Sequence, residues 1–598
     1  MREPRPREDR SRPNDEYAGT APARPKTPSP PALVACLIFG VCTLVLATHW
    51  PVLSAGASSF DDENYLTDNP IIQNPGWTSV RRAFAEVLEP YVSGYYEPLH
   101  VVSLMLDYAR GGRIDRLRPF HQTNLVLHVA NTGLVVLLLY LLFRQPLPAA
   151  VVGLLFGVHP LTVEPIALVA QRKVLLAGFF SLSCLILYVR YARSGGRATL
   201  ATAIVMYALA LLSKPTSTPL PVLLLLLDFW PLRRLNRRAI VEKVPFFLLA
   251  VVSGAITLIA CGRTSGIAWP GRSSLTEVPL TIAYLIAFYG WKTVWPARLS
   301  CLYVLPEPFA LSNPLVLTGV LATCVLLATV AIALRWTRAP LTAALFFLVA
   351  IFPTMGAVGY TWVTASDKHV YLPAVGLLLA LTYGLARLWS EPAVSRPRRA
   401  LRIAVAVAAA GAVGAEITAT RAYLAAWRDS YTLSRRMVTL APTSPRAHNS
   451  LGVILAGNGD AKQAAECFRK ALRLDPDYAE AHYNLGHALA DQGKLDEAIR
   501  HYEQAARLRP HYWEAYNNLG VAMLRTARFQ AAGEAFREVL RIKPGYADAW
   551  YNLAVAMENL GRTAEAIEAL EAVLRIQPTD EEARSRLHAL QNRRKNKR

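Results

Sequence analysis

Two adjacent acids, Asp61 and Asp62, follow the first hydrophobic segment of the chain almost directly. A carboxylate close to a membrane face is costly unless it is used or well solvated. An acceptor hydroxyl is a poor nucleophile, and a carboxylate that takes its proton would activate it. Asp62, together with Asp61, is therefore the candidate catalytic base. The alternative is that these acids only flank a membrane span, where water is available.

A stripe of polar residues opens the hydrophobic segment at 121–143. His121, Asn124, His128 and Asn131 are spaced three and four apart, so they share one face of a helix. Polar groups at that depth normally face a bundle interior or a wet cavity. His121 and His128 are therefore candidates for substrate binding. The alternative is that the stripe only forms hydrogen bonds with neighbouring helices.

Two further clusters combine cations with acids at the ends of hydrophobic segments. One follows the segment at 147–163, where two prolines open the backbone. The other opens the segment at 370–389. Cations there would meet the charge of a phosphate leaving group, whereas the alternative is that they merely flank helix ends. The candidate phosphate-binding or substrate-binding residues of the two clusters are His159, Glu164, Arg172, Lys173, Lys368 and His369.

The composition indicates that a membrane bundle positions these residues. Hydrophobic residues make up 53% of the 598 residues, which is too apolar for an ordinary soluble protein. The net charge is +21, but the basic residues collect in the two terminal segments and in the linkers between apolar segments. Such a distribution sets membrane topology, so we expect no nucleic-acid partner.

The apolar segments between residues 32 and 420 predict a polytopic helical bundle with about 11 crossings. Residues 1–31 are predicted to form a disordered cytoplasmic tail. Residues 53–120 form a large external loop that carries the candidate acids. We expect the segment at 279–297 not to cross, because the arginine-rich loop at 395–399 belongs on the cytoplasmic side. Residues beyond 420 then lie on the same side as the acids.

The C-terminal part is an internal repeat of 34 residues. Prolines recur at this period from Pro442 to Pro578, and small residues recur with them. Period 34, with Leu-Gly in the first helix and a terminal proline, is the tetratricopeptide pattern. We predict four repeats over 444–579, preceded by a degenerate repeat or linker at 421–443. Residues 580–598 are expected to form a capping helix and a basic tail.

One equivalent position in the first helix of each repeat is predicted to line the concave surface. Asparagine side chains there can pair with the backbone of an extended peptide. The alternative is that they only hydrogen-bond between repeats. The four predicted groove residues are Ser450, Asn484, Asn518 and Asn552.

Together these motifs resemble the transmembrane and tetratricopeptide-repeat O-mannosyltransferases and their bacterial relatives, which belong to the GT-C superfamily of glycosyltransferases. The resemblance covers nearly the whole chain and depends on the order and spacing of short motifs. Those motifs are Phe60-Asp61-Asp62, Tyr96-Glu97-Pro98-Leu99, Phe120-His121, His159-Pro160, Arg172-Lys173 and Asp367-Lys368-His369, followed by the repeats.

The resemblance implies an all-α, multi-pass protein of the bacterial inner membrane with a cytoplasmic N-terminus. It implies transfer of a sugar, with inversion, from a polyprenyl-phosphate carrier to a protein serine or threonine hydroxyl on the extracytoplasmic side. The repeats would bind the acceptor or another partner. Some superfamily members use a divalent cation and others use none, and no ligand spacing here decides between them. Two rival hypotheses are a non-catalytic membrane-anchored scaffold and a flippase for lipid-linked sugars.

Overall fold

The computed structural model describes residues 30–57, 60–67, 69–85, 96–264, 277–355, 365–390 and 396–595. Within these ranges the regular elements are helices, and no β-strand is present. This confirms the all-α prediction. All but the last two residues of the predicted tail at 1–31 lie outside the described residues.

The N-terminal part contains eighteen α-helices in the described residues, several of them joined by short 3-10 helices. The α-helices are α1 (Pro30–His49), α2 (Phe60–Leu66), α3 (Pro70–Gln73), α4 (Trp77–Ala85), α5 (Pro98–Ala109), α6 (Arg118–Phe143), α7 (Pro146–Val158), α8 (Val163–Ala167), α9 (Arg172–Ser194), α10 (Arg197–Ser213), α11 (Leu220–Phe229), α12 (Arg237–Val241), α13 (Val244–Thr264), α14 (Glu277–Val294), α15 (Pro314–Ala333), α16 (Ala339–Ile351), α17 (Ala374–Ser390) and α18 (Arg396–Leu424). The 3-10 helices used below are η1 (Trp50–Ser54), η2 (Pro160–Thr162), η3 (Val169–Gln171), η4 (Pro215–Ser217), η7 (Asp367–Val370) and η8 (Ala425–Trp427).

Six of the described helices are long and apolar enough to cross a membrane, and they centre on α1, α6, α9, α13, α15 and α18. The pair of α7 with η2 and α8 would make a seventh span, bent by 54°. Shorter apolar helices, including α10, α16 and α17, complete the bundle. These features support a multi-pass membrane protein. The number of crossings stays a prediction, as does the expectation that 279–297 does not cross.

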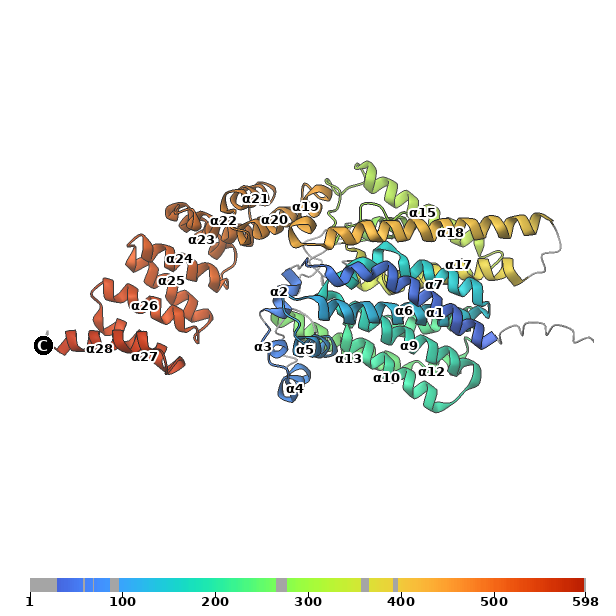
Figure 1. Cartoon of the computed structure of the whole chain (residues 1–598), viewed down its shortest axis with the longest axis horizontal. Coiled ribbons are helices and arrows are strands. Elements are labelled where there is room, and N and C mark those ends of the chain that lie inside the picture. The colour runs from blue at the N-terminus through green and yellow to red at the C-terminus, as the bar shows by residue number, and fades with distance from the viewer. Residues whose placement is uncertain are drawn as a thin grey trace, which may run out of the picture.

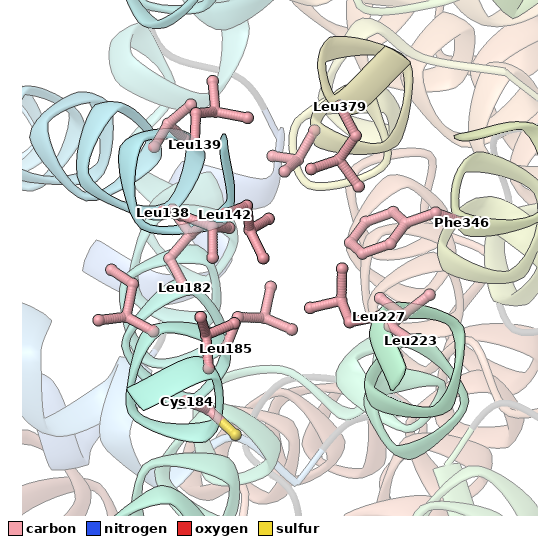
Figure 2. Packing of buried hydrophobic residues seen from close by; sticks show 14 of the residues in the cluster. Leu138, Leu139, Leu142, Leu182, Cys184, Leu185, Leu223, Leu227, Phe346 and Leu379 are labelled. Atoms are coloured by element: carbon pink, nitrogen blue, oxygen red, sulfur yellow. The ribbon is translucent and has the colours of Figure 1, made fainter. Parts of the chain in front are cut away.

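The bundle core is formed by leucines from helices that are far apart in the sequence. Figure 2 shows Leu138 and Leu142 of α6 and Leu182 of α9 across from Leu227 of α11 and Phe346 of α16. Helices that are apolar on most sides need such partners or lipid around them. In a membrane the association depends on close packing and not on exclusion of water. The core therefore fixes where the polar ends of these helices lie.

Small residues let α7 approach α6 closely. A Cβ added to Gly153 would lie 2.3 Å from Cγ2 of Val136. A Cβ on Gly157 would lie 2.6 Å from Cγ2 of Thr132. Because glycine has no side chain, the two backbones can come together at this crossing.

A buried charge network closes one end of the bundle. Asp228 and Lys243 are both fully buried and form an ion pair. Tyr188 donates a hydrogen bond to the same carboxylate at 2.5 Å, and Arg234 lies 3.2 Å from its other oxygen. The charges are thus compensated where α9, α11 and α13 meet.

The C-terminal part is a stack of helix pairs that follows α18 and a single helix, α19 (Ser430–Leu440). The four pairs confirm the tetratricopeptide pattern. They are α20 (Pro445–Gly457) with α21 (Ala461–Leu474), α22 (Ala479–Asp491) with α23 (Leu495–Leu508), α24 (Trp513–Arg525) with α25 (Phe529–Ile542), and α26 (Ala547–Asn559) with α27 (Thr563–Ile576), before a last helix, α28 (Glu581–Lys595).

A glycine and an aromatic ring form the contact inside each of the first three pairs. A Cβ on Gly486 would lie 2.8 Å from the ring of Tyr502, so only glycine leaves room for the ring. The fourth pair has Ala554 at the glycine position and the smaller Leu570 at the ring position. The same packing contact thus recurs every 34 residues in the first three pairs.

The acidic first loop and the base of the repeats lie at the same end of the bundle. In Figure 1, α2 to α5 and α19 lie at one end, whereas α1 and α18 begin at the other. The backbone N–H of Gly56 donates to the carbonyl of Arg428 at 3.0 Å. Arg436 of α19 donates to the carbonyl of Leu299 at 3.1 Å. Hydrogen bonds therefore join η8 and α19 to the loops at this end.

Candidate active site

The candidate acids lie on α2, a helix of two turns. Asp62 is fully buried, and its Oδ1 accepts a hydrogen bond from the backbone N–H of Ala170 at 2.7 Å. Ala170 belongs to η3, directly before α9, so Asp62 joins the first loop to the start of α9. Asp61 lies on the same helix, but its side chain lies outside the described residues.

A buried ion pair lies beside Tyr65, which follows Asp62 by about one helical turn on α2. Lys173 Nζ lies 3.0 Å from Glu97 Oε1, and the hydroxyl of Tyr65 lies 3.2 Å from Lys173 Nζ. His100 packs against Tyr65 with ring centroids 4.7 Å apart. Burial opposes the charge on Glu97, but the Lys173 ammonium and the His100 ring outweigh it and lower the pKa of Glu97 to about 2. The first loop therefore carries a carboxylate that holds Lys173 in place.

A second lysine faces an acid across the bundle. Lys368 Nζ lies 3.5 Å from Glu164 Oε1, and the Lys368 backbone N–H donates to Oε2 at 3.0 Å. Ser366 donates to the same carboxylate at 2.8 Å. His369 lies 3.0 Å from the hydroxyl of Tyr289. Burial and the nearby charge of Lys368 lower the pKa of His369 well below its ordinary value, so its ring is neutral.

A third lysine, Lys214, lies near enough to the other two for their charges to interact. Lys214 follows α10 at the break before η4, and no hydrogen bond or ion pair joins its side chain to the described residues. Burial and the ammonium groups of Lys173 and Lys368 lower the pKa of Lys214 to about 7. The three lysines therefore form one cluster built from three separate elements. A lysine between two short apolar helices was the signal that could have identified it.

Arg172 is held inside the bundle. Its guanidinium pairs with Asp107 at 2.6 Å and donates to Asn124 at 2.8 Å. It also donates to the carbonyls of Ser103 and Phe120, both at 2.9 Å. These bonds tie α9 to α5 and α6. A phosphate would have to displace some of them, so a phosphate contact of Arg172 stays a prediction.

The polar stripe of α6 is buried and joins helices. His121 Nε2 lies 3.2 Å from the carbonyl of Ala55. His128 lies 2.8 Å from the carbonyl of Gly157 and 2.9 Å from the hydroxyl of Tyr371. The structure therefore shows the helix-to-helix bonds that the alternative interpretation expected. A contact of His121 or His128 with substrate stays a prediction.

His159 lies at the bend between α7 and α8. Its Nδ1 accepts a hydrogen bond from the backbone N–H of Leu161 at 3.2 Å, which caps η2. Its Nε2 lies 3.0 Å from the carbonyl of Thr293 and 3.8 Å from Glu416 Oε1. His159 thus joins α14 and α18 to the bend, and a contact of His159 with substrate stays a prediction.

Two of the predicted groove residues form hydrogen bonds with the preceding repeat. Asn484 donates to Asn449 at 3.0 Å, and Asn518 donates to the hydroxyl of Tyr483 at 3.1 Å. Ser450 lies 3.4 Å from the hydroxyl of Ser434, whereas no side-chain hydrogen bond joins Asn552 to the described residues. Peptide binding by these four residues stays a prediction.

The lysine cluster carries three cationic side chains against the two acids Glu97 and Glu164. Because the lysines outnumber these acids, the cluster suits a phosphate, whose oxygens bind ammonium groups as point charges. Asp62 supplies a carboxylate from the helix that also carries Tyr65. Among the described residues, no group of three histidine, cysteine, aspartate or glutamate side chains is placed to hold a metal ion.

Comparison with known proteins identifies the repeats. Family models described as tetratricopeptide repeats match residues 458–493, 483–547 and 524–590. The C-terminal region is a tetratricopeptide-repeat domain. Among solved structures, "YrrB: a TPR protein with an unusual peptide-binding site" is 26% identical, with a TM-score of 0.25, and the match covers 27% of this chain and 81% of that one.

Several curated relatives carry the name protein O-mannosyl-transferase. TMTC2 of Homo sapiens is 28% identical over 158 residues, which are 26% of this chain and 18% of that protein. Tmtc2 of Drosophila melanogaster is 30% identical over 234 residues, which are 37% of this chain and 24% of that protein. The chain thus matches less than a quarter of the length of these relatives. The matches confirm the resemblance that the sequence motifs indicated.

Proposed function

We propose that this chain is an integral membrane glycosyltransferase that moves a sugar from a polyprenyl-phosphate carrier to a protein serine or threonine hydroxyl. The observation that supports this proposal most strongly is that the charges of Lys173, Lys214 and Lys368 interact, with Lys173 bonded to Tyr65 of the helix that carries Asp62. The cluster is suited to an anionic leaving group, and the carboxylate is suited to an acceptor proton. The names of the partly matching relatives agree with this reaction class.

In the proposed reaction, the acceptor oxygen attacks the anomeric carbon while the bond from that carbon to the phosphate oxygen breaks. The bonding electrons leave with the polyprenyl phosphate, whose new charge is met by the lysine cluster. The hydroxyl proton passes to Asp62, with Asp61 beside it on α2. One displacement of this kind inverts the anomeric centre. No general acid is needed, because a phosphate is already a good leaving group.

Basic residues at the far end of the bundle support an extracytoplasmic site. Arg193 donates to the carbonyl of Leu142 at 3.1 Å, and Arg338 lies over the ring of Phe229 at 4.8 Å. The 26 residues of α6 rise by about 39 Å, so this end lies roughly a bilayer away from His121. Arginine-rich ends tend to stay in the cytoplasm. The proposed site and the repeats would then share the opposite compartment, where the repeats bind the acceptor.

A non-catalytic scaffold is the second candidate function. The observation that favours it is that Asp62 is fully buried and already accepts a backbone hydrogen bond, as a structural acid would. In that case the repeats would bind a partner, and the membrane part would be an anchor.

Sugar transfer with the purified full-length chain separates the two functions. The assay uses a panel of polyprenyl-phosphate sugars with an acceptor peptide rich in serine and threonine. Asp62→Asn is compared with Asp115→Asn, which changes an exposed acid in the same loop. We expect transfer by the wild type and by the control, and loss by about 10²-fold or more in Asp62→Asn. Full activity in Asp62→Asn would show that the assigned base is wrong. A wild type that is inert with every donor would support the scaffold.

A further inference from the structure

A cleft of about 470 Å³ runs along α19, apart from the lysine cluster. Its described lining consists mainly of arginine and hydroxyl side chains and contains no acid. Such groups donate several hydrogen bonds at once, and guanidinium groups match the geometry of a phosphate. The polar side chains of the lining are Arg428, Tyr431, Thr432, Arg435, Arg436 and Thr439.

Two of the three arginines have donors to spare. Arg436 is engaged, because its Nε and Nη2 donate to the carbonyl of Leu299 at 3.2 and 3.1 Å. Arg428 uses its Nε on Asp429 at 3.0 Å, which leaves its terminal nitrogens. Arg435 is exposed, and no hydrogen bond or ion pair joins its side chain to the described residues. An anion in the cleft would therefore contact Arg435 and Arg428 while Arg436 keeps α19 in place.

The cleft begins where a candidate membrane span ends. The apolar stretch from Arg396 reaches Trp427, so Arg428 is the first residue beyond it. Most of α18 is exposed in the structure, as expected for a helix that faces lipid. A cationic side chain at this position lies at the level of the headgroups.

Two exposed tryptophans precede segments that form hydrogen bonds with residues of the cleft. Trp50 of η1 is 56% exposed, and η1 precedes Gly56, which donates to the carbonyl of Arg428. Trp295 is 60% exposed and precedes the Leu299 carbonyl that binds Arg436. Exposed tryptophans of membrane proteins gather at the boundary between hydrocarbon and water. The cleft thus opens at this boundary.

We propose that the α19 cleft binds the phosphate headgroup of an anionic membrane lipid. The arginines and hydroxyls of the cleft suit a phosphodiester flanked by hydroxyls. A lipid held there would fasten α19, and the repeats that follow it, against the end of the bundle that carries Asp62. This lipid is separate from the sugar carrier, and the inference does not depend on the chemistry proposed above.

Native mass spectrometry and lipid titration of the full-length chain test this inference. The chain is placed in nanodiscs of phosphatidylcholine alone or with added phosphatidylglycerol, and bound lipid is counted after release. The test variant Arg428→Gln/Arg435→Gln leaves Arg436 and the packing of α19 untouched. The control is Arg473→Gln, which changes an exposed arginine of α21. Further arms offer inorganic phosphate and a polyprenyl phosphate to the detergent-solubilised protein.

We expect saturable retention of phosphatidylglycerol by the wild type and by Arg473→Gln. The double variant should bind it about tenfold more weakly or worse, since each arginine near an anionic surface adds to the attraction. Equal retention by the double variant and the wild type would overturn the inference. It would also be overturned if the wild type retained both lipids equally, or if the double variant lost polyprenyl phosphate or inorganic phosphate instead. Sugar transfer plays no part in this readout, so failure here leaves the proposed reaction standing.

Discussion

Lys173 Nζ lies 3.0 Å from Glu97 Oε1, although the two residues are 76 positions apart in the sequence. The pair joins the first turn of α9 to the start of α5, and both side chains are largely buried. A buried ion pair fixes geometry more reliably than it adds stability. We therefore regard Glu97 as the residue that holds one phosphate-binding cation in position.

Replacing Glu97 by glutamine should destabilise the protein by about 3 kcal/mol, because Lys173 would keep a buried charge without its partner. The pKa of Glu97 is lowered to about 2, below the usual value of 4.5. Its contribution is therefore complete above pH 4.5 and is lost as the pH falls toward 2. Thermal unfolding of the wild type and Glu97→Gln in detergent between pH 3 and 7 measures this contribution to stability. Identical acid sensitivity of the wild type and Glu97→Gln would contradict the prediction.

Lys214 should make phosphate binding depend on pH. Its pKa of about 7 means that it is charged below neutrality and loses its charge as the pH rises. Binding of a polyprenyl phosphate should therefore weaken by up to about tenfold from pH 7 to 8. Lys214→Arg stays charged and should flatten this dependence. The titration of the ligand itself is common to both proteins, so an equal slope for the two would count against the prediction.

Arg172 should matter for stability more than for phosphate contact. Arg172→Met leaves Asp107 buried without its 2.6 Å partner, and we expect a loss of about 3 to 5 kcal/mol. Lys214→Met removes a lysine with no ion pair among the described residues, and should leave stability within about 0.5 kcal/mol or improve it. The melting temperatures of Arg172→Met and Lys214→Met, each compared with the wild type, measure these losses of stability. Comparable losses in both would mean that Lys214 is also structural.

The contact between Gly486 and the ring of Tyr502 can be tested by substitution, and the fourth repeat shows which pair of residues replaces it. Gly486→Ala places a Cβ 2.8 Å from the ring of Tyr502, and should cost about 1 to 3 kcal/mol. Adding Tyr502→Leu should recover part of this loss, because the fourth repeat pairs Ala554 with Leu570. A double-mutant cycle on the full-length chain measures the coupling. Additive losses would show that the ring contact is not the cause.

The repeats were predictable from the sequence because their contacts are local and recur every 34 residues. Gly486 and Tyr502 lie 16 positions apart, and the same pairing is visible in the neighbouring repeats. The all-α fold followed from the apolar segments and this period. The placement of the first loop beside the base of the repeats depended on counting crossings, and the count stays a prediction.

The composition of the lysine cluster was harder to predict. Proximity in the sequence suggested that Lys173 belongs with Glu164, yet the structure pairs Lys173 with Glu97 and Glu164 with Lys368. Such pairings depend on which helix ends meet, and helix crossing is decided by packing in the core. Lys214 has no charged neighbour in the chain, and its place between two short apolar helices was the signal that could have identified it. Only the convergence of α9, α10 and η7 brings it into the cluster.

The initial rate of sugar transfer from a labelled polyprenyl-phosphate donor by full-length Lys214→Met shows whether the lysine cluster receives the leaving phosphate. The control is Lys462→Met, which changes an exposed lysine of α21. We expect Lys462→Met to retain the wild-type rate and Lys214→Met to be slower by about 10²-fold, since one cation facing the leaving phosphate is lost. A wild type that transfers sugar and a Lys214→Met variant within twofold of it would contradict the central claim that the lysine cluster receives the phosphate.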